Sequence, residues 1–381
     1  MEPKHNYQTK RVLLVASYAE SLLNFRGPLI KNIIALGHEV IIAAPDISQT
    51  THSQLLKMGA TVFETPLART GLNPVKDLKY MFAIKAIIKS TKPDLLLTYT
   101  IKPNIWGAFA ARSTNTESVA MVTGLGYAFT DSGSKSLVGG LVRRIAAALY
   151  RAATNYNKLV IFQNPDDRDD FISSGCLSNS AKARLVNGSG VDMSYYSDAP
   201  LPDQPVFLMV SRLLGNKGVR EYCTAAISVL KSHPQARFLL VGYIDEGPDG
   251  ISQAELDTWI DGGVEYKGPQ ADVRPFVAQA SVYVLPSYRE GTPRSVLEAM
   301  SMGRPIITSD APGCRETVID GETGFLVPVC DVDALADRMR WMIEHPEQRA
   351  IMGKSSKNLA QEKYDVIKVN KALLDHLELS H

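Results

Sequence analysis

Residues 281–298 read SVYVLPSYREGTPRSVLE, and their pattern indicates the fold class. Its first six residues form an apolar run that ends at Pro286, which predicts a buried strand. A polar turn follows, and proline is favoured in the first turn of helices, so a helix is predicted to begin near Pro293 or Arg294. A strand that leads through a short turn into a helix is the repeating unit of a parallel α/β sheet.

The same alternation of strands and amphipathic helices extends along the whole chain, with a restart near its middle. Two successive doubly wound domains are the simplest architecture that accounts for it. The predicted strands are 11–16, 39–44, 94–99, 118–122 and 158–163, then 206–211, 236–242, 264–267, 281–286 and 304–308, and helices are predicted over 28–36, 74–89 and 136–156.

The length of 381 residues exceeds what one ordinary core requires and fits two domains. The stretch 197–205 is rich in proline and aspartate, which is typical of a linker. We therefore predict an N-terminal domain over residues 1–198, a second domain over 199–362, and a final helix over 363–381 that crosses back to the first domain. Because open α/β sheets bind ligands at the carboxyl ends of their strands, we expect a ligand cleft between the two domains.

The composition is 45% hydrophobic and 21% charged, which is typical of a globular protein and excludes collagen-like and disordered classes. No apolar run approaches the roughly 18 residues that cross a bilayer, and the polar start lacks a signal peptide, so a cytoplasmic protein is predicted. The four cysteines and seven histidines are scattered without ligand spacing. We expect neither a disulfide framework nor a metal site.

The two halves of the chain differ in charge. Residues 1–190 contain 22 Lys and Arg against 13 Asp and Glu, whereas the second half is acidic. The basic half suggests an anionic partner. Within it, residues 135–156 combine apolar residues at helical spacing with Arg143, Arg144 and Arg151, which fits either a helix on an anionic membrane surface or a core helix with solvated arginines. No groove-binding motif points to nucleic acid.

Four charged residues follow strands of the second domain and could share one ligand. Glu290 precedes the predicted helix and Glu298 lies two turns along it, so both carboxylates could bind hydroxyls of an elongated ligand. Gly291 permits close backbone approach, and the helix N-terminus favours an anion such as a diphosphate. Arg212 offers a planar fork for phosphate and Lys217 a point charge. A capped helix with two surface carboxylates would also fit these residues taken alone.

Glu290 and Glu298 stand as E-x7-E within LPSYREGTPRSVLEAMSMGRPIITSD, which resembles the signature of retaining glycosyltransferase family 4. Further blocks in matching order are VSRLLGNKGV, YKGPQADV and APGCRETVIDGETGFLV. The resemblance implies the GT-B fold, an α/β architecture of two Rossmann-like doubly wound domains facing across a cleft. In the first half, SLLNFRGPLIKNIIALGHEV, TYTIKPNIWGAFAAR and MVTGLGYAFTD are similar to bacterial α-1,3-N-acetylgalactosaminyltransferases that act on polyprenyl-diphosphate-linked sugars.

The resemblance also implies roles for single residues. Arg212 and Lys217 would bind the donor diphosphate, Glu298 the ribose and Glu290 the transferred sugar. The loop from Ser17 to Ser21 lacks the glycines common in the family, and Ile101 stands where many members carry histidine, so the sugar stays open. The remaining donor-side residues are Gly291, Thr292, Pro293, Arg294, Gly242 and Gly268, and the acceptor-side residues are Arg26, Lys102, Asn104, Gly124, Gly126 and Tyr127.

The implied activity is retaining transfer of N-acetylgalactosamine or another N-acetylhexosamine from a UDP-sugar to an undecaprenyl-diphosphate-linked sugar in cell-surface glycan assembly. The enzyme would need no cofactor or metal and would lie on the inner face of the cytoplasmic membrane. The D-x-D pattern at Asp331 and Asp333 is better explained by helix capping. A nucleotide-sugar epimerase or a phosphorylase with the same fold is the main alternative. A dinucleotide oxidoreductase would need G-x-G-x-x-G after the first strand, and a periplasmic-type binding module would need a signal peptide.

Overall fold

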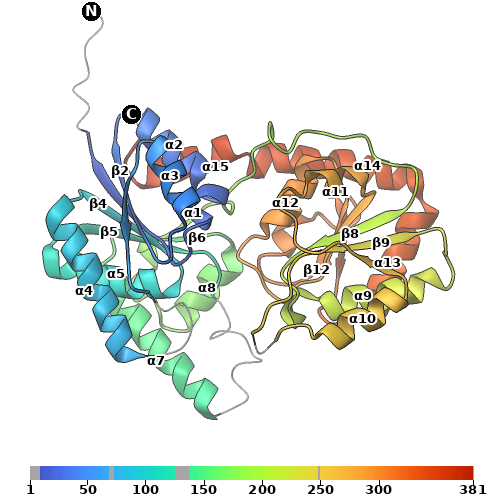
Figure 1. Ribbon diagram of the computed structural model, residues 1–381, viewed down its shortest axis with the longest axis horizontal. Coiled ribbons are helices and arrows are strands. Elements are labelled where there is room, and N and C mark those ends of the chain that lie inside the picture. The colour runs from blue at the N-terminus through green and yellow to red at the C-terminus, as the bar shows by residue number, and fades with distance from the viewer. Residues whose placement is uncertain (1–8, 68–72, 126–136, 248, 381) are drawn as a thin grey trace, which may run out of the picture. The chain divides into compact units, whose positions relative to one another are not determined.

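The computed structural model describes residues 9–67, 73–125, 137–247 and 249–380, and of residues 137–143 the backbone alone. The chain forms two compact units (Figure 1). Unit 1 comprises residues 1–189 and 369–381, and unit 2 comprises residues 190–368. Each unit contains one parallel sheet with helices packed on it.

Unit 1 has, among its described residues, a seven-stranded sheet of order β3-β2-β1-β4-β5-β6-β7. All of its described strand pairs are parallel. The strands are β1 Arg11–Val15, β2 Glu39–Ala44, β3 Thr61–Glu64, β4 Leu95–Tyr99, β5 Glu117–Val122, β6 Leu159–Phe162 and β7 Ala183–Leu185. The helices are α1 Ser21–Asn24, α2 Gly27–Ala35, α3 Gln49–Lys57, α4 Pro74–Thr91, α5 Ile101–Thr114, α7 Leu137–Thr154, α8 Pro165–Ser173 and the 3-10 turn η2 Ser180–Lys182.

Alternate side chains of the unit 1 strands point to opposite faces of the sheet, where they enter separate hydrophobic cores. Leu13 packs in one core with Tyr80 and Ile84 of α4. Leu14 packs in another core with helix α2 and with the end of the chain. The sheet is therefore covered by α4 and α5 on one face and by α2 and α3 on the other.

The C-terminal segment is part of the unit 1 core. Helix α15 spans Val366–His376, and the side chains of Leu373 and Leu377 are buried beside those of β1. His38 Nδ1 accepts a hydrogen bond from the Lys10 backbone at 3.2 Å, and its Nε2 lies 3.1 Å from the carbonyl oxygen of Leu379. The final residues thus complete the first unit although they follow the second in sequence.

Unit 2 has, over its described residues, a six-stranded sheet of order β10-β9-β8-β11-β12-β13, again parallel. The strands are β8 Val206–Val210, β9 Arg237–Val241, β10 Val264–Tyr266, β11 Val282–Leu285, β12 Ile306–Ser309 and β13 Gly324–Val327. The helices are α9 Val219–Leu230, α10 Gln253–Asp261, α11 Arg274–Gln279, α12 Arg294–Ser301, α13 Val332–Glu344 and α14 Pro346–Leu359, with 3-10 turns η3 Gly215–Lys217 and η4 Arg315–Thr317 and the π-turn η5 Ala360–Tyr364.

Unit 2 begins before the boundary that linker composition suggested. The Val191 backbone donates to the carbonyl oxygen of Tyr364 at 2.8 Å and accepts from Val366 at 3.0 Å. The buried guanidinium of Arg304 donates to the carbonyl oxygens of Ala199 and Pro200. These bonds attach residues 190–200 to unit 2, so a proline-rich stretch that resembles a free linker is packed instead.

Three strands, β3, β7 and β13, were not predicted from the sequence pattern, and each lies at the edge of its sheet. Strands β3 (TVFE) and β7 (ARL) are short and carry polar residues, which removes the apolar run that marks a central strand, whereas β13 (GFLV) is apolar but only four residues long. Helix α12 begins at Arg294 as predicted, but Glu298 is its fifth residue. At 3.6 residues per turn, Glu298 therefore lies little more than one turn along the helix rather than two.

Candidate active site

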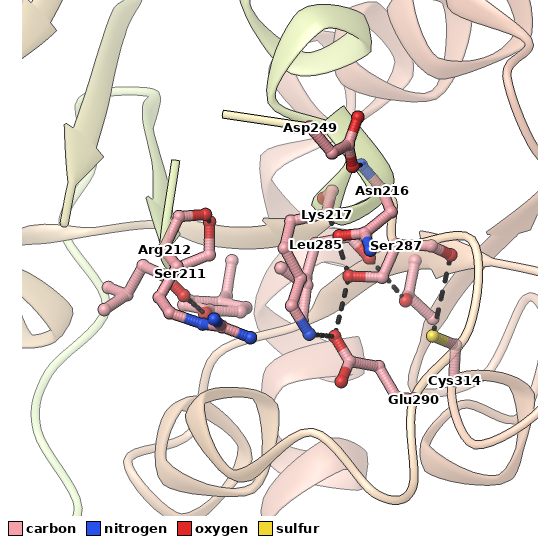
Figure 2. Close-up of polar contacts among 12 residues, drawn as sticks. Ser211, Arg212, Asn216, Lys217, Asp249, Leu285, Ser287, Glu290 and Cys314 are labelled. Atoms are coloured by element: carbon pink, nitrogen blue, oxygen red, sulfur yellow. Dashed lines mark hydrogen bonds and ion pairs between the residues drawn. The ribbon is translucent and has the colours of Figure 1, made fainter. Parts of the chain in front are cut away.

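The carboxyl ends of β8 and β11 bring Lys217 and Glu290 together. Lys217 Nζ lies 2.5 Å from Glu290 Oε1, and Ser287 Oγ donates to the same oxygen at 2.8 Å (Figure 2). The side chains of Lys217 and Glu290 are only 20% and 13% exposed. A charged cluster at this edge of a parallel sheet occupies the position where open α/β folds bind ligands.

Two glycines allow the loops around this cluster to touch. Gly313 has φ +77°, and a Cβ there would overlap the carbonyl oxygen of Glu290. Gly218 has φ +75°, and a Cβ there would overlap that of Pro286. The Glu290 backbone also donates to the carbonyl oxygen of Pro312 at 2.9 Å. The loop that carries Glu290 is thus fixed by backbone contacts on both sides.

Arg212 lies in the loop that follows β8. Its Nη1 is 3.1 Å from Asp245 Oδ2, and its side chain is 48% exposed. Gly242, with φ +150°, leaves no room for a Cβ against the carbonyl oxygen of Ser211, and its backbone donates to Gly268 at 3.0 Å. The loops after β8, β9 and β10 therefore meet at one edge.

A second aspartate, Asp249, connects two loops at the same edge of the sheet. Asp249 accepts a hydrogen bond from the Asn216 backbone at 2.7 Å (Figure 2). The Gly215 backbone donates to the Asp249 carbonyl oxygen at 2.8 Å. These contacts hold turn η3, whose last residue is Lys217, against the loop after β9.

Glu298 lies on the same strand–turn–helix segment as Glu290 but is already engaged. Its Oε1 is 3.1 Å from Arg294 Nε one helical turn earlier. Burial raises the pKa of Glu298, and the charge of Arg294 together with a hydrogen bond from Tyr196 opposes this shift. Pro293 is the N-cap residue of α12, and Thr292 Oγ1 donates to the carbonyl oxygen of Gly291 at 2.8 Å. The donor-side residues predicted from sequence thus all belong to unit 2, either in its loops and 3-10 turns or in helix α12.

The predicted acceptor-side residues of unit 1 have structural partners. Lys102 Nζ lies 2.9 Å from Asp77 Oδ1 in a buried ion pair that joins α5 to α4. Asn104 is buried and donates to the carbonyl oxygen of Met121 in β5 at 2.8 Å. Arg26 is buried, with its guanidinium 5.3 Å from the ring centre of Tyr99. Gly124 follows β5 with φ +128°, whereas Gly126 and Tyr127 lie outside the described residues.

Sequence reasoning missed Ser287, Asp245 and Gly313. Ser287 directly follows the proline that ends the strand, a position that could have signalled it. Nothing in the sequence pairs Asp245 with Arg212 or Gly313 with Glu290, because each pair joins separate loops. Asp331 caps helix α13 by accepting from the Ala334 backbone at 2.9 Å, as predicted. Within the described ranges, no three His, Cys, Asp or Glu side chains cluster in a way that could hold a metal ion.

Two segments of the chain match known protein families. Residues 204–345 match the family described as Glycosyl transferases group 1, and residues 11–164 match the one described as Glycosyl transferase 4-like. The chain belongs to these glycosyltransferases. These matches confirm the family resemblance that the E-x7-E segment and the flanking blocks indicated.

Two curated relatives align with most of this glycosyltransferase. The N,N'-diacetylbacillosaminyl-diphospho-undecaprenol alpha-1,3-N-acetylgalactosaminyltransferase of Campylobacter jejuni is 28% identical over 361 residues, covering 91% of this chain and 93% of the relative. The UDP-Gal:alpha-D-GlcNAc-diphosphoundecaprenol alpha-1,3-galactosyltransferase of Escherichia coli is 25% identical over 320 residues, with 80% of each chain covered.

Among solved structures, Anabaena HepE in complex with UDP and glucose superposes with a TM-score of 0.77 at 19% identity, covering 97% of this chain and 99% of that one. This similarity confirms the predicted GT-B fold of two parallel α/β domains. In the part of the glycosyltransferase that the structure describes, no helix is both long enough and apolar enough to span a bilayer.

Proposed function

We propose that this glycosyltransferase moves N-acetylgalactosamine or another N-acetylhexosamine from a UDP-sugar to an undecaprenyl-diphosphate-linked sugar, in the assembly of a cell-surface glycan. The observation that carries the proposal is the Lys217–Glu290–Ser287 cluster at the carboxyl edge of the unit 2 sheet. Two relatives that cover at least 80% of the chain are named for transfer to sugars on diphospho-undecaprenol, which supports the acceptor class.

The donor diphosphate would lie between Arg212 and Lys217. Each cation is paired with a carboxylate, Arg212 with Asp245 and Lys217 with Glu290. These pairs keep both cations oriented toward the sheet edge. A bound diphosphate would replace part of the interaction between each cation and its carboxylate. Glu290 would then accept hydrogen bonds from hydroxyls of the transferred sugar, and Glu298 from the ribose.

Several backbone groups would complete the donor site. The backbones of Gly291, Thr292 and Pro293 and the side chain of Arg294 would contact sugar or phosphate at the start of α12. The uracil base would lie near Gly242 and Gly268, whose backbones already join the loops after β9 and β10. Unit 1 would bind the acceptor, with Arg26, Lys102 and Asn104 shaping its site from within the fold.

We infer a reaction with retention at the anomeric carbon. The acceptor oxygen forms its bond to that carbon on the face from which the diphosphate leaves, the carbon–oxygen bond to the diphosphate breaks, and the acceptor proton passes to a diphosphate oxygen. The two cations stabilise the charge that develops on the leaving group. The proposed reaction uses no resident metal ion. The hydrogen bond by which Asp331 caps helix α13 supports this proposal, because it explains the aspartate of the D-x-D pattern without a metal.

A peripheral position at the inner membrane face follows from a lipid-linked acceptor. The segment 135–156, for which the sequence fits either a membrane-surface helix or a core helix, includes α7, in which Arg144, Ile145 and Arg151 are exposed. The same helix buries Tyr150 against Phe171, with ring centres 4.8 Å apart. It is thus partly a core helix, and Arg143 lies among the residues whose side chains are not described.

The proposal is tested by nucleotide release over a panel of UDP- and GDP-sugars, each with and without a short-chain polyprenyl-diphosphate-GalNAc acceptor. Release of UDP that depends on acceptor and on one N-acetylhexosamine donor is the expected result. Anomeric configuration of the product, read by NMR, tests retention, and activity in excess EDTA tests independence from metal. Turnover of a UDP-sugar without acceptor would contradict the proposal and favour an epimerase.

A further inference from the structure

Helix α4 of unit 1 presents an apolar stripe that no described part of the chain covers. Val75, Leu78 and Phe82 are 66%, 44% and 54% exposed. They recur at intervals of three and four residues, so they share one face of the helix. Tyr80 and Ile84 are fully buried in the core beneath the opposite face. The stripe therefore points away from the sheet.

The charged residues of α4 are almost all basic. Lys76, Lys79 and Lys89 are exposed, and Lys85 is half-buried. The one acid of the helix, Asp77, is 5% exposed and neutralised by Lys102. The accessible surface of α4 thus combines three large apolar side chains with four lysines, two of which, Lys76 and Lys79, line a pocket together with Asp46 and Glu64.

The positive charge continues on the helices beside α4. Helix α5 packs against α4, and α7 packs against α5 (Figure 1). Neither α5 nor α7 contains an acidic residue. Apart from Lys102, which is buried and paired with Asp77, their basic residues are Arg112, Arg143, Arg144 and Arg151. The acidic helix α8 lies beyond α7, with Phe171 packed against Tyr150.

We propose that α4 is the element by which this protein docks on an anionic phospholipid bilayer. Val75, Leu78 and Phe82 would enter the boundary between headgroups and acyl chains, while the lysines bind lipid phosphates. A second copy of the chain is disfavoured as the occupant, because it would bring a like-charged surface to this one. The inference rests on the proposed function only in that a lipid-linked acceptor explains why the enzyme would need a membrane surface.

Flotation of the purified full chain with vesicles tests the surface directly. We expect binding to vesicles of phosphatidylcholine with phosphatidylglycerol, weaker binding to phosphatidylcholine alone, and a loss of at least about tenfold in the double variants Leu78→Ser/Phe82→Ser and Lys79→Glu/Lys89→Glu. The matched control is Leu56→Ser/Lys57→Glu on α3, where Leu56 is 50% exposed on the opposite face of unit 1. Equal binding by the α4 variants and the wild type would overturn the proposal.

A fluorescent side chain makes the test residue-specific. Phe82→Trp should show a blue-shifted emission and quenching by brominated lipids on anionic vesicles, whereas Leu56→Trp should show neither. No change at position 82 would refute docking through α4. Transfer to a water-soluble short-chain acceptor without vesicles should be the same in the α4 variants and the wild type, so a failure of the proposed activity is distinguishable from a failure of membrane docking.

Discussion

Lys217 Nζ and Glu290 Oε1 lie 2.5 Å apart, and this ion pair joins the loops that follow β8 and β11. Ser287, fully buried, donates to the same carboxylate oxygen and fixes its orientation. The two residues proposed to bind the donor diphosphate and the donor sugar therefore position one another. Their substitution should separate diphosphate binding from sugar transfer.

Replacing Lys217 by methionine removes the partly buried cation but keeps a long unbranched side chain. We expect kcat/KM for transfer to fall by roughly 100-fold, about 3 kcal/mol of lost charge stabilisation, together with weaker binding of UDP. Glu290→Gln should instead leave UDP binding at least as strong, because Lys217 loses its competing carboxylate, while transfer falls. Calorimetric titration with UDP and steady-state UDP release measure the two effects. Weaker UDP binding in both variants would argue against these separate roles.

Gly313 and Gly321 provide a matched pair for testing the loop contact behind Glu290. Both have a positive φ, +77° and +76°, so alanine adds about 1–2 kcal/mol of backbone strain at either site. A Cβ at position 313 would also overlap the carbonyl oxygen of Glu290, whereas nothing lies within 4 Å of one at position 321. Gly313→Ala should therefore lower kcat/KM at least about tenfold through displacement of Glu290, and Gly321→Ala should not. Equal activities in the two variants would show that the contact does not position Glu290.

The sequence was sufficient to predict the central strands and the residues of the E-x7-E segment, because both depend on local patterns. Val282–Leu285 is a continuous apolar run, and Pro293 marks the start of α12. Two contacts of the site join loops that are distant in sequence. They are the ion pair of Arg212 with Asp245 and the close approach of Gly313 to the backbone of Glu290. Periodicity carries no information about such contacts. The same reason explains why Lys102, assigned to the acceptor side, is found in a buried pair with Asp77.

The C-terminal segment offers a test of how unit 1 is stabilised. Leu377 is 2% exposed in the unit 1 core, whereas Ile367, near the start of α15, is 71% exposed. Leu377→Ala should lower the free energy of unfolding of unit 1 by about 2–4 kcal/mol through loss of burial and creation of a cavity. Ile367→Ala, at an exposed position that belongs to unit 2, should change it by less than about 0.5 kcal/mol. Urea denaturation of the full chain, followed by hydrogen exchange in β1 and β2, measures the difference. An equal effect of both changes would contradict the placement of Leu377 in that core.

Glu265 of β10 should make unit 2 sensitive to acid. Arg237 binds both of its carboxylate oxygens, at 2.6 and 2.7 Å, and Lys267 lies 2.8 Å from one of them. The hydrogen bonds from Arg237, ahead of the smaller effect of Lys267, lower the pKa of Glu265 from 4.5 to about 2. Because the folded state lowers this pKa, the stabilisation is fully present above pH 4.5 and is lost as the pH falls toward 2. The free energy of unfolding of Glu265→Gln should therefore lie below that of the wild type at neutral pH and approach it in acid.

Glu322→Gln, an exposed site in the same unit, should keep the wild-type pH profile. Parallel profiles for Glu265→Gln and the wild type between pH 4.5 and 2, measured by urea denaturation, would show that this carboxylate does not link proton binding to folding.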